Sequence, residues 1–148
     1  MDPFLKLAYQ QAVKSYQEGG IPIGSVVVQD GQVVGQGHNQ RVQKKSVVLH
    51  GEMDALENTG RRSAEFYRNC TLYTTLSPCP MCSGTILLYG IPKVVIAENK
   101  TFMGEEELLK SRGVNVIVVN DQACYDLMQK FIAEQPQLWN EDISVLSK

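Results

Sequence analysis

The chain has little excess charge and no long apolar run, and each of these features excludes a class of protein. Its 148 residues carry 14 lysines and arginines against 16 aspartates and glutamates, a formal net charge of −2. A protein that binds DNA or RNA needs a positive surface field, so this balance argues against a nucleic-acid partner. The apolar stretch over residues 85–97 is broken by Gly90, Pro92 and Lys93. It falls well short of the ~20 apolar residues that span a bilayer, so we expect no membrane span.

Prolines are also few, at 6, and no repeat, low-complexity run or linker interrupts the chain. With 43% hydrophobic and 20% charged residues, the composition lies near the globular averages of about 45–50% and 25%. Disorder and fibrous structure are therefore excluded. We expect a single domain over residues 1–148, with a C-terminal lid segment at about 136–148 that holds the one tryptophan, Trp139.

The N-terminus lacks a basic region followed by an apolar run, and it lacks a small-residue cleavage site, which together predict a cytoplasmic protein. In a reducing compartment, four cysteines are expected to be thiols or metal ligands rather than disulfides. Cys70 and Cys124 have no partner at ligand spacing, so we interpret them as buried thiols without a role. Cys79 and Cys82, by contrast, lie three residues apart.

Local signals predict an alternation of helices and strands. Asp2-Pro3 is typical of a helix start, and Asp30-Gly31 is typical of a tight hairpin. Strands are expected over residues 23–29, 32–37, 71–76, 93–97 and 114–119, and helices over about 2–18, 50–60, 80–89, 105–112 and 121–134. A crossover helix makes the last two strands parallel. The fold class is therefore α/β, a three-layer α/β/α domain around a five-stranded mixed sheet.

Two short motifs indicate a metal site. A residue before proline is pushed out of helical geometry, so Cys79 should cap the helix that Pro80 begins, with Cys82 in its first turn. The unpaired N–H groups and the dipole at that helix start favour thiolates. His50 opens a second helix that can face the same point. One imidazole and two thiolates suit zinc, and three protein ligands leave a fourth position for water.

Glu52 follows the histidine by two residues and makes the site look catalytic. Metal coordination lowers the pKa of bound water towards ~7, and a nearby carboxylate can take its proton and pass it to a substrate. The pattern His-x-Glu followed by Pro-Cys-x-x-Cys is the mark of zinc deaminases.

The chain also resembles the fungal-type cytosine deaminases of the cytidine and deoxycytidylate deaminase superfamily. The resemblance covers almost the whole chain, and it lies in residues 18–24, 37–39, 50–52, 71–82, 89–92 and 136–143. It implies a small homodimer that hydrolyses free cytosine to uracil and ammonia, with one catalytic zinc ion per subunit and no organic cofactor. A nucleobase is the implied small-molecule substrate.

The resemblance also assigns roles to individual residues. The zinc ligands would be His50, Cys79 and Cys82, and Glu52 would be the proton shuttle. The substrate ring would be held by Asn39 and the Gly51 N–H at its amide edge, by the Ser77 carbonyl and Asp142 at its amine, and by apolar walls from Ile23, Leu76, Phe102 and Trp139.

Other interpretations of these residues remain open. The Cys-x-x-Cys pair alone could be a redox dithiol, and Glu52 alone could be an ordinary first-turn acid. The zinc could hold together a binding module without catalysis. The same machinery could also act on another small amino-heterocycle, such as guanine, isocytosine or creatinine, or on tRNA adenosine, although tRNA binding would need a basic surface. We interpret His38 as a hydrogen-bonded loop histidine, and the apolar helix over residues 80–89 as buried on nearly every side and part of a subunit interface.

Overall fold

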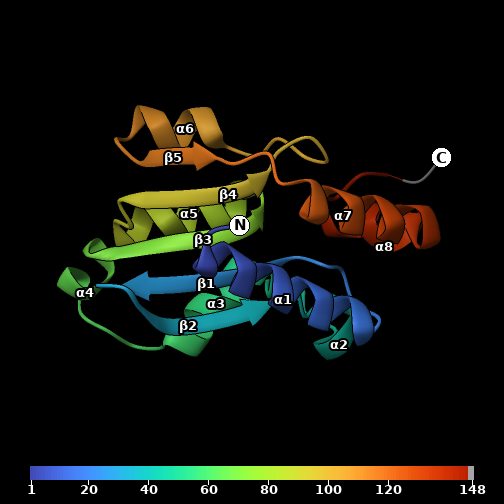
Figure 1. Cartoon of the computed structure of the whole chain (residues 1–148), viewed down its shortest axis with the longest axis horizontal. Helices are drawn as coiled ribbons and strands as arrows, with labels where there is room; N and C mark the ends of the chain where they lie inside the picture. The colour runs from blue at the N-terminus through green and yellow to red at the C-terminus, as the bar shows by residue number, and fades with distance from the viewer. Residues whose placement is uncertain (147–148) are drawn as a thin grey trace.

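A computed structural model describes residues 1–146 of the chain. At its centre lies one five-stranded sheet in the order β2-β1-β3-β4-β5 (Figure 1). The strands are β1 Gly24–Gln29, β2 Gln32–His38, β3 Cys70–Leu76, β4 Lys93–Glu98 and β5 Asn115–Val118. Strand β1 is antiparallel to β2 and β3, whereas β3, β4 and β5 run parallel. The predicted hairpin and the predicted parallel pair are both confirmed.

Helices cover both faces of the sheet, as the sequence predicted. Helix α1 lies in front of the strands in Figure 1, next to α7, whereas α3 and α5 lie behind them. Helices α6 and α8 follow β4 and α7 along the chain. The helices are α1 Pro3–Gln17, α2 Arg41–Lys44, α3 Gly51–Thr59, α4 Ala64–Arg68, α5 Pro80–Tyr89, α6 Glu106–Ser111, α7 Gln122–Glu134 and α8 Pro136–Asp142.

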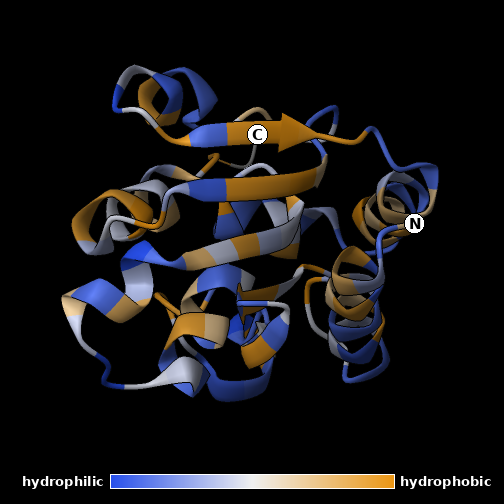
Figure 2. Ribbon diagram, turned by 60° about the vertical axis from the view of Figure 1, so that its left-hand side comes forward, coloured by the Kyte–Doolittle hydropathy of each residue, from blue (hydrophilic) through white to orange (hydrophobic). Residues whose placement is uncertain are grey.

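Alternation along β1 builds the core on both sides of the sheet. Val27 faces α3 and α5 within a cluster that includes Leu72 and Ile86, while Val26 packs with Ala8 of α1 on the other face. Side chains on a strand point to opposite faces in turn, so one strand supplies both layers. Figure 2 shows strands β4 and β5 hydrophobic along most of their length. Strand β4 is buried along almost all of it, as expected for a strand covered on both faces, whereas the edge strand β5 alternates between exposed and half-buried residues.

Side-chain caps fix the starts of α1, α5 and α7, as well as that of the short helix α4. The Asp2 carboxylate accepts hydrogen bonds from the Phe4 and Leu5 N–H groups, and Asp121 accepts one from Cys124 at the start of α7. Cys79 caps α5 in the same way, through a bond from the Cys82 N–H. A capping side chain satisfies N–H groups that a helix leaves unpaired, and this is why the starts of α1, α5 and α7 were predictable.

Two short helices and one pattern of burial differ from the sequence prediction. Helices α2 and α4 have 4 and 5 residues and are not among the expected helices, because neither is long enough to show a helical period. Helix α5 was expected to be buried on nearly every side, which is wrong for the single chain, because Leu88 is 73% exposed and Tyr89 is 44% exposed. No helix among the described residues is long and apolar enough to cross a membrane.

Candidate zinc and substrate site

Two helix starts place the expected metal ligands beside one another. His50 is the N-cap residue of α3 and Cys79 is the N-cap residue of α5, both with extended backbone angles. Cys82 lies in the first turn of α5, where its side chain turns back towards the cap. The sequence prediction for this local geometry is confirmed, because the proline after Cys79 keeps that residue out of the helix.

The three donor atoms form a compact triangle. Cys79 Sγ lies 3.4 Å from His50 Nδ1 and 3.6 Å from Cys82 Sγ, and Cys82 Sγ lies 3.8 Å from His50 Nδ1. Zn–S bonds of about 2.3 Å and Zn–N bonds of about 2.0–2.1 Å in a tetrahedron separate the ligand atoms by about 3.5–3.8 Å. The donor set and its spacing therefore fit zinc.

The far side of the imidazole ring is held by Asp142. His50 Nε2 lies 3.2 Å from Asp142 Oδ1, and Asn39 Nδ2 donates to both oxygens of the same carboxylate at 3.2 and 3.3 Å. The side-chain oxygen Oδ1 of Asn39 accepts a bond from the Arg41 N–H. A carboxylate on the second nitrogen fixes the orientation of a ligating histidine, so Asp142 leaves Nδ1 free to face the sulfurs.

The charges of the triad are coupled. The hydrogen bond with Cys82 lowers the pKa of the Cys79 thiol to about 4, while the same bond and burial raise the pKa of Cys82. Burial opposes a charge on His50, but the hydrogen bonds to Asp142 and Cys79 outweigh it and raise its pKa to about 10. Cys79 is thus poised as a thiolate, which is the form that binds metal.

Glu52 lies on the first turn of α3 and is only 3% exposed. Burial, together with the charge of Cys79, raises the pKa of its carboxyl to about 7. The carboxyl can therefore hold or release a proton near neutral pH, which is what general acid–base chemistry requires.

A small cavity of about 20 Å³ opens onto these groups. It is lined by Ile23, His50, Glu52, Leu76, Ser77, Cys79, Phe102, Trp139, Asp142 and Ile143. The structure therefore brings together most of the expected substrate contacts. Two others lie just behind this lining: Asn39, which is fully buried, and Gly51, the first residue of α3.

Residues far apart in sequence make the outer wall of the cavity. The rings of Phe102 and Trp139 meet edge to face, with centroids 6.3 Å apart. Ile143 completes this wall, although the sequence prediction missed it. It directly follows the Trp139 to Asp142 segment on α8, so its proximity to Asp142 was the one available signal.

A buried polar network supports the Asn39 segment from behind. His38 is the last residue of β2 rather than a loop residue, and its Nε2 lies 2.7 Å from Glu18 Oε1. Its N–H donates to Asp54, which is buried. The predicted hydrogen-bonded state of His38 is confirmed, and Cys70 and Cys124 are buried free thiols as expected.

The comparisons with known proteins agree with this geometry. The model of the cytidine and deoxycytidylate deaminase zinc-binding region matches residues 2–98. The chain is 61% identical to a cytosine deaminase of Candida albicans over 140 residues, which is 94% of this chain and 93% of that protein. It is 39% identical to a tRNA-specific adenosine deaminase of Streptococcus pyogenes, over 88% of this chain and 89% of that one.

Solved structures share the fold at lower identity. A guanine deaminase from Nitrosomonas europaea superposes with a TM-score of 0.71 at 20% identity, covering 88% of this chain and 83% of that one. A structure from work on tRNA A34 deaminases superposes with a TM-score of 0.70 at 22% identity, covering 84% of this chain and 97% of that one. With the matched zinc-binding region and the extent of its identity to curated deaminases, the chain belongs to the cytidine and deoxycytidylate deaminase family.

Proposed function

We propose that this protein hydrolyses free cytosine to uracil and ammonia, with a zinc ion bound by His50, Cys79 and Cys82. The observation that carries this proposal is a buried acid, Glu52, beside a zinc-compatible triad at the wall of a small cavity. The identity to the Candida albicans cytosine deaminase supports the choice of base.

Each group near the triad has a task in that reaction. Zinc held there supplies a nucleophile from water at neutral pH. Glu52 takes one proton from the attacking water and delivers it to ring N3, and it then takes the proton of the new hydroxyl group and delivers it to the departing amine. The product ammonia then leaves, and the ring keeps the oxygen as the uracil carbonyl.

The cavity suits a neutral planar base. Its apolar lining from Ile23, Leu76, Phe102 and Trp139 can enclose the ring, while the Ser77 carbonyl and Asp142 can accept hydrogen bonds from the amine. Asn39 and the Gly51 N–H would hold the opposite, amide edge. At about 20 Å³ the cavity lies far below the ~300–1,000 Å³ typical of drug-sized ligands, so its wall must move to admit a base, and the small space favours a free base over a nucleoside.

A second candidate is the deamination of another small amino-heterocycle by the same groups. The fold shared with the Nitrosomonas europaea guanine deaminase is the observation that favours it. A panel of cytosine, isocytosine, guanine, adenosine and creatinine, incubated with zinc-loaded protein and followed by ammonia release, separates the two. Turnover of another base without turnover of cytosine would establish the second candidate.

Glu52→Gln separates catalysis from a zinc site that only stabilises a binding module. The amide keeps the size of the side chain but cannot carry the proton, so we expect full zinc content and a loss of turnover of about 10²–10⁴-fold. Zinc measured by atomic absorption and ammonia release from the same preparation provide both readings. Unchanged turnover would show that the zinc site only stabilises the fold.

The C-terminal segment is proposed to gate the cavity. Helix α8 carries Trp139 and Asp142, and it is tied to α2 by an ion pair at 2.9 Å between Arg41 and Glu141. Its opening would release product, a step that limits turnover in many enzymes. Truncation before Pro136 removes this segment together with Trp139 and Asp142, so it should abolish cytosine turnover, and unchanged turnover would refute the gate.

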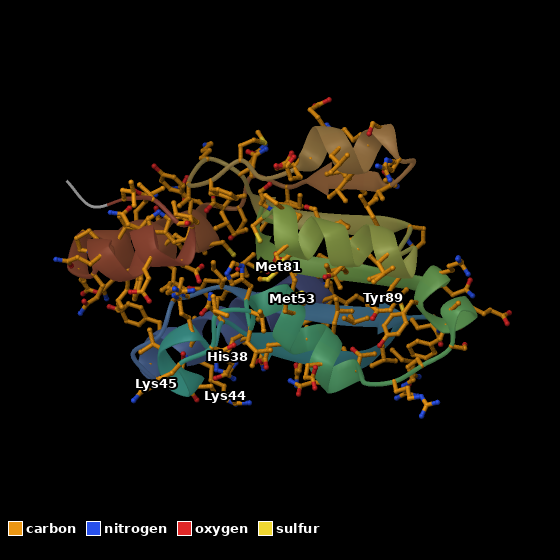
Figure 3. The ribbon with its side chains drawn as sticks, turned by 180° about the vertical axis from the view of Figure 1, so that it is seen from behind. His38, Lys44, Lys45, Met53, Met81 and Tyr89 are labelled. Carbon is orange, nitrogen blue, oxygen red and sulfur yellow. The ribbon has the colours of Figure 1, made fainter. Side chains whose placement is uncertain are left out.

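The outer face of α5 is proposed to form a homodimer contact. Leu88 and Tyr89 are exposed there, and Figure 3 shows Tyr89 and Met81 of α5 on the same side of the molecule as Met53 of α3. Such an apolar surface is typical of subunit interfaces. Leu88→Glu should shift the sedimentation of the protein from dimer to monomer, whereas Val33→Glu, on the edge strand β2, should not.

A further inference from the structure

Two buried carboxylates that the proposed reaction does not use bracket the loop over residues 99–105. Glu98 is 1% exposed at the end of β4, and Glu106 is 4% exposed at the start of α6. Phe102, one wall of the cavity, lies between them. Buried charges are costly unless they are hydrogen-bonded, so their partners show what each acid holds in place.

Glu98 fixes the first half of the loop. Its Oε2 accepts hydrogen bonds from the Lys100 N–H at 2.8 Å and from the Thr101 N–H at 3.0 Å. Both are backbone donors, and together they turn the chain directly before Phe102. The backbone of this half is therefore held independently of the side chains in the cavity.

Glu106 links the second half of the loop to Ser77, which lines the cavity. Its Oε2 accepts a hydrogen bond of 2.6 Å from the Ser77 hydroxyl, and its Oε1 accepts one of 3.3 Å from Asn99 Nδ2. The Ser77 hydroxyl in turn accepts a bond of 2.9 Å from the Gly104 N–H. Hydrogen bonds to a carboxylate are short and strong, so a single acid ties together Ser77 and both ends of the loop.

The backbone of the loop also rests directly on the segment before Cys79. The Glu105 N–H donates to the Pro78 carbonyl at 3.1 Å. A Cβ atom on Gly104 would lie 1.9 Å from the same carbonyl oxygen, so no other residue fits there without a shift. The loop, Ser77 and the chain that leads into Cys79 are thus one packed unit.

We propose that Glu106 is a positioning residue for the substrate cavity. Through the Ser77 hydroxyl it sets the place of the Ser77 carbonyl, and through the loop it sets the Phe102 ring. The identity of the base that these groups contact rests on the proposed function, whereas the positioning of the cavity wall does not.

The test compares three variants of the zinc-loaded protein. Glu106→Ala removes both bonds and should raise the KM for cytosine roughly 10-fold with kcat within about threefold, since Ser77 and Phe102 contact substrate and transition state alike. Glu106→Gln keeps an acceptor for the Ser77 hydroxyl and should stay within about threefold of the parent in KM. Glu107→Gln is the matched control, since it removes the same charge one residue away on the exposed side of α6, and it should change neither constant.

Fluorescence gives a reading that does not depend on any substrate. Trp139 is the only tryptophan and contacts Phe102. Glu106→Ala should increase acrylamide quenching of its emission at temperatures where the variant is folded, while Glu106→Gln and Glu107→Gln should not. If the parent protein deaminated no base, the proposed function would fail, yet the quenching would still decide the role of Glu106.

Ser77→Ala tests the same link if Glu106→Ala does not fold. It keeps the carbonyl and removes only the hydroxyl, so it should show the same rise in KM and in quenching. If Glu106→Ala does fold, a protein with both Ser77→Ala and Glu106→Ala should show no larger rise in KM or in quenching than either single variant, because both substitutions break the same hydrogen bond. A Ser77→Ala protein with unchanged KM and unchanged quenching would overturn the proposal, as would a Glu106→Ala protein that is only less stable.

Discussion

Asp142 Oδ1 lies 3.2 Å from His50 Nε2, on the side of the imidazole ring away from the two sulfurs. The same carboxylate accepts hydrogen bonds from Asn39. One side chain on α8 therefore touches both the proposed metal ligand and the proposed anchor of the substrate amide edge.

Asp142→Ala should weaken zinc binding. Loss of the partner of a ligating histidine typically costs 10–100-fold in metal affinity or activity, so we expect zinc affinity to fall by about that factor. Competition with a chromogenic chelator measures it. Glu141→Gln, a neighbour whose carboxylate is largely exposed, serves as control and should bind zinc like the parent protein.

Removal of the metal should lower stability as well as activity. Metal bound only by the folded protein adds its binding free energy to folding, so dialysis against a strong chelator should reduce the melting temperature. Differential scanning calorimetry before and after zinc is restored checks this. A Cys82→Ser protein should melt near the metal-free parent and respond little to added zinc, and a full response would argue against Cys82 as a ligand.

The contact between Glu18 and His38 predicts a pH dependence of stability. The hydrogen bond with His38 lowers the pKa of Glu18 below its ordinary value of 4.5. A lowered pKa in the folded state means that Glu18 contributes stability above about pH 4.5, and that this contribution is lost as the pH falls through its folded pKa.

Glu18→Gln should therefore cost stability mainly at pH 6–7, by about 0.5–1 kcal/mol because the carboxylate is partly exposed. The difference from the parent should shrink towards pH 3–4. Urea unfolding across this range measures it. A difference that grows on acidification would contradict the assigned sign, and Glu57→Gln, on an exposed face of α3, is a control that should show no comparable trend.

Gly104→Ala should destabilise the protein by about 1–3 kcal/mol, the usual cost of overpacking. The added Cβ would meet the Pro78 carbonyl oxygen at 1.9 Å, and that oxygen is backbone that cannot rotate away. Urea unfolding measures the loss. Met103→Ala, an exposed neighbour, should stay within about 0.5 kcal/mol of the parent.

Sequence reasoning succeeded where a signal was local. Asp2 before Pro3, Cys79 before Pro80 and Asp121 each mark a helix start through the chemistry of one or two residues, and all three cap helices in the structure. The metal triad was predictable for the same reason, since its members lie at helix starts whose directions follow from capping.

The sequence could not show contacts that form only when distant elements pack. Nothing local to Glu98 or Glu106 distinguishes them from surface acids, yet strand β4 and helix α6 bury both. The contact between His50 and Asp142 depends on the position in which α8 packs, which the local sequence does not determine. Leu88 is a different case. An apolar helix predicts that its side chains are buried, but the sequence does not show whether the same chain or a second copy covers them.

The order of synthesis gives the closure by α8 a further meaning. Asn39 and Asp142 stand 103 residues apart, and strands β3, β4 and β5 lie between them along the chain. The ribosome therefore synthesises the three proposed zinc ligands and Glu52 well before Asp142, whose carboxylate orients His50. Activity would then begin only after translation has passed residue 142, and a nascent or clipped chain could hold zinc without deaminating anything.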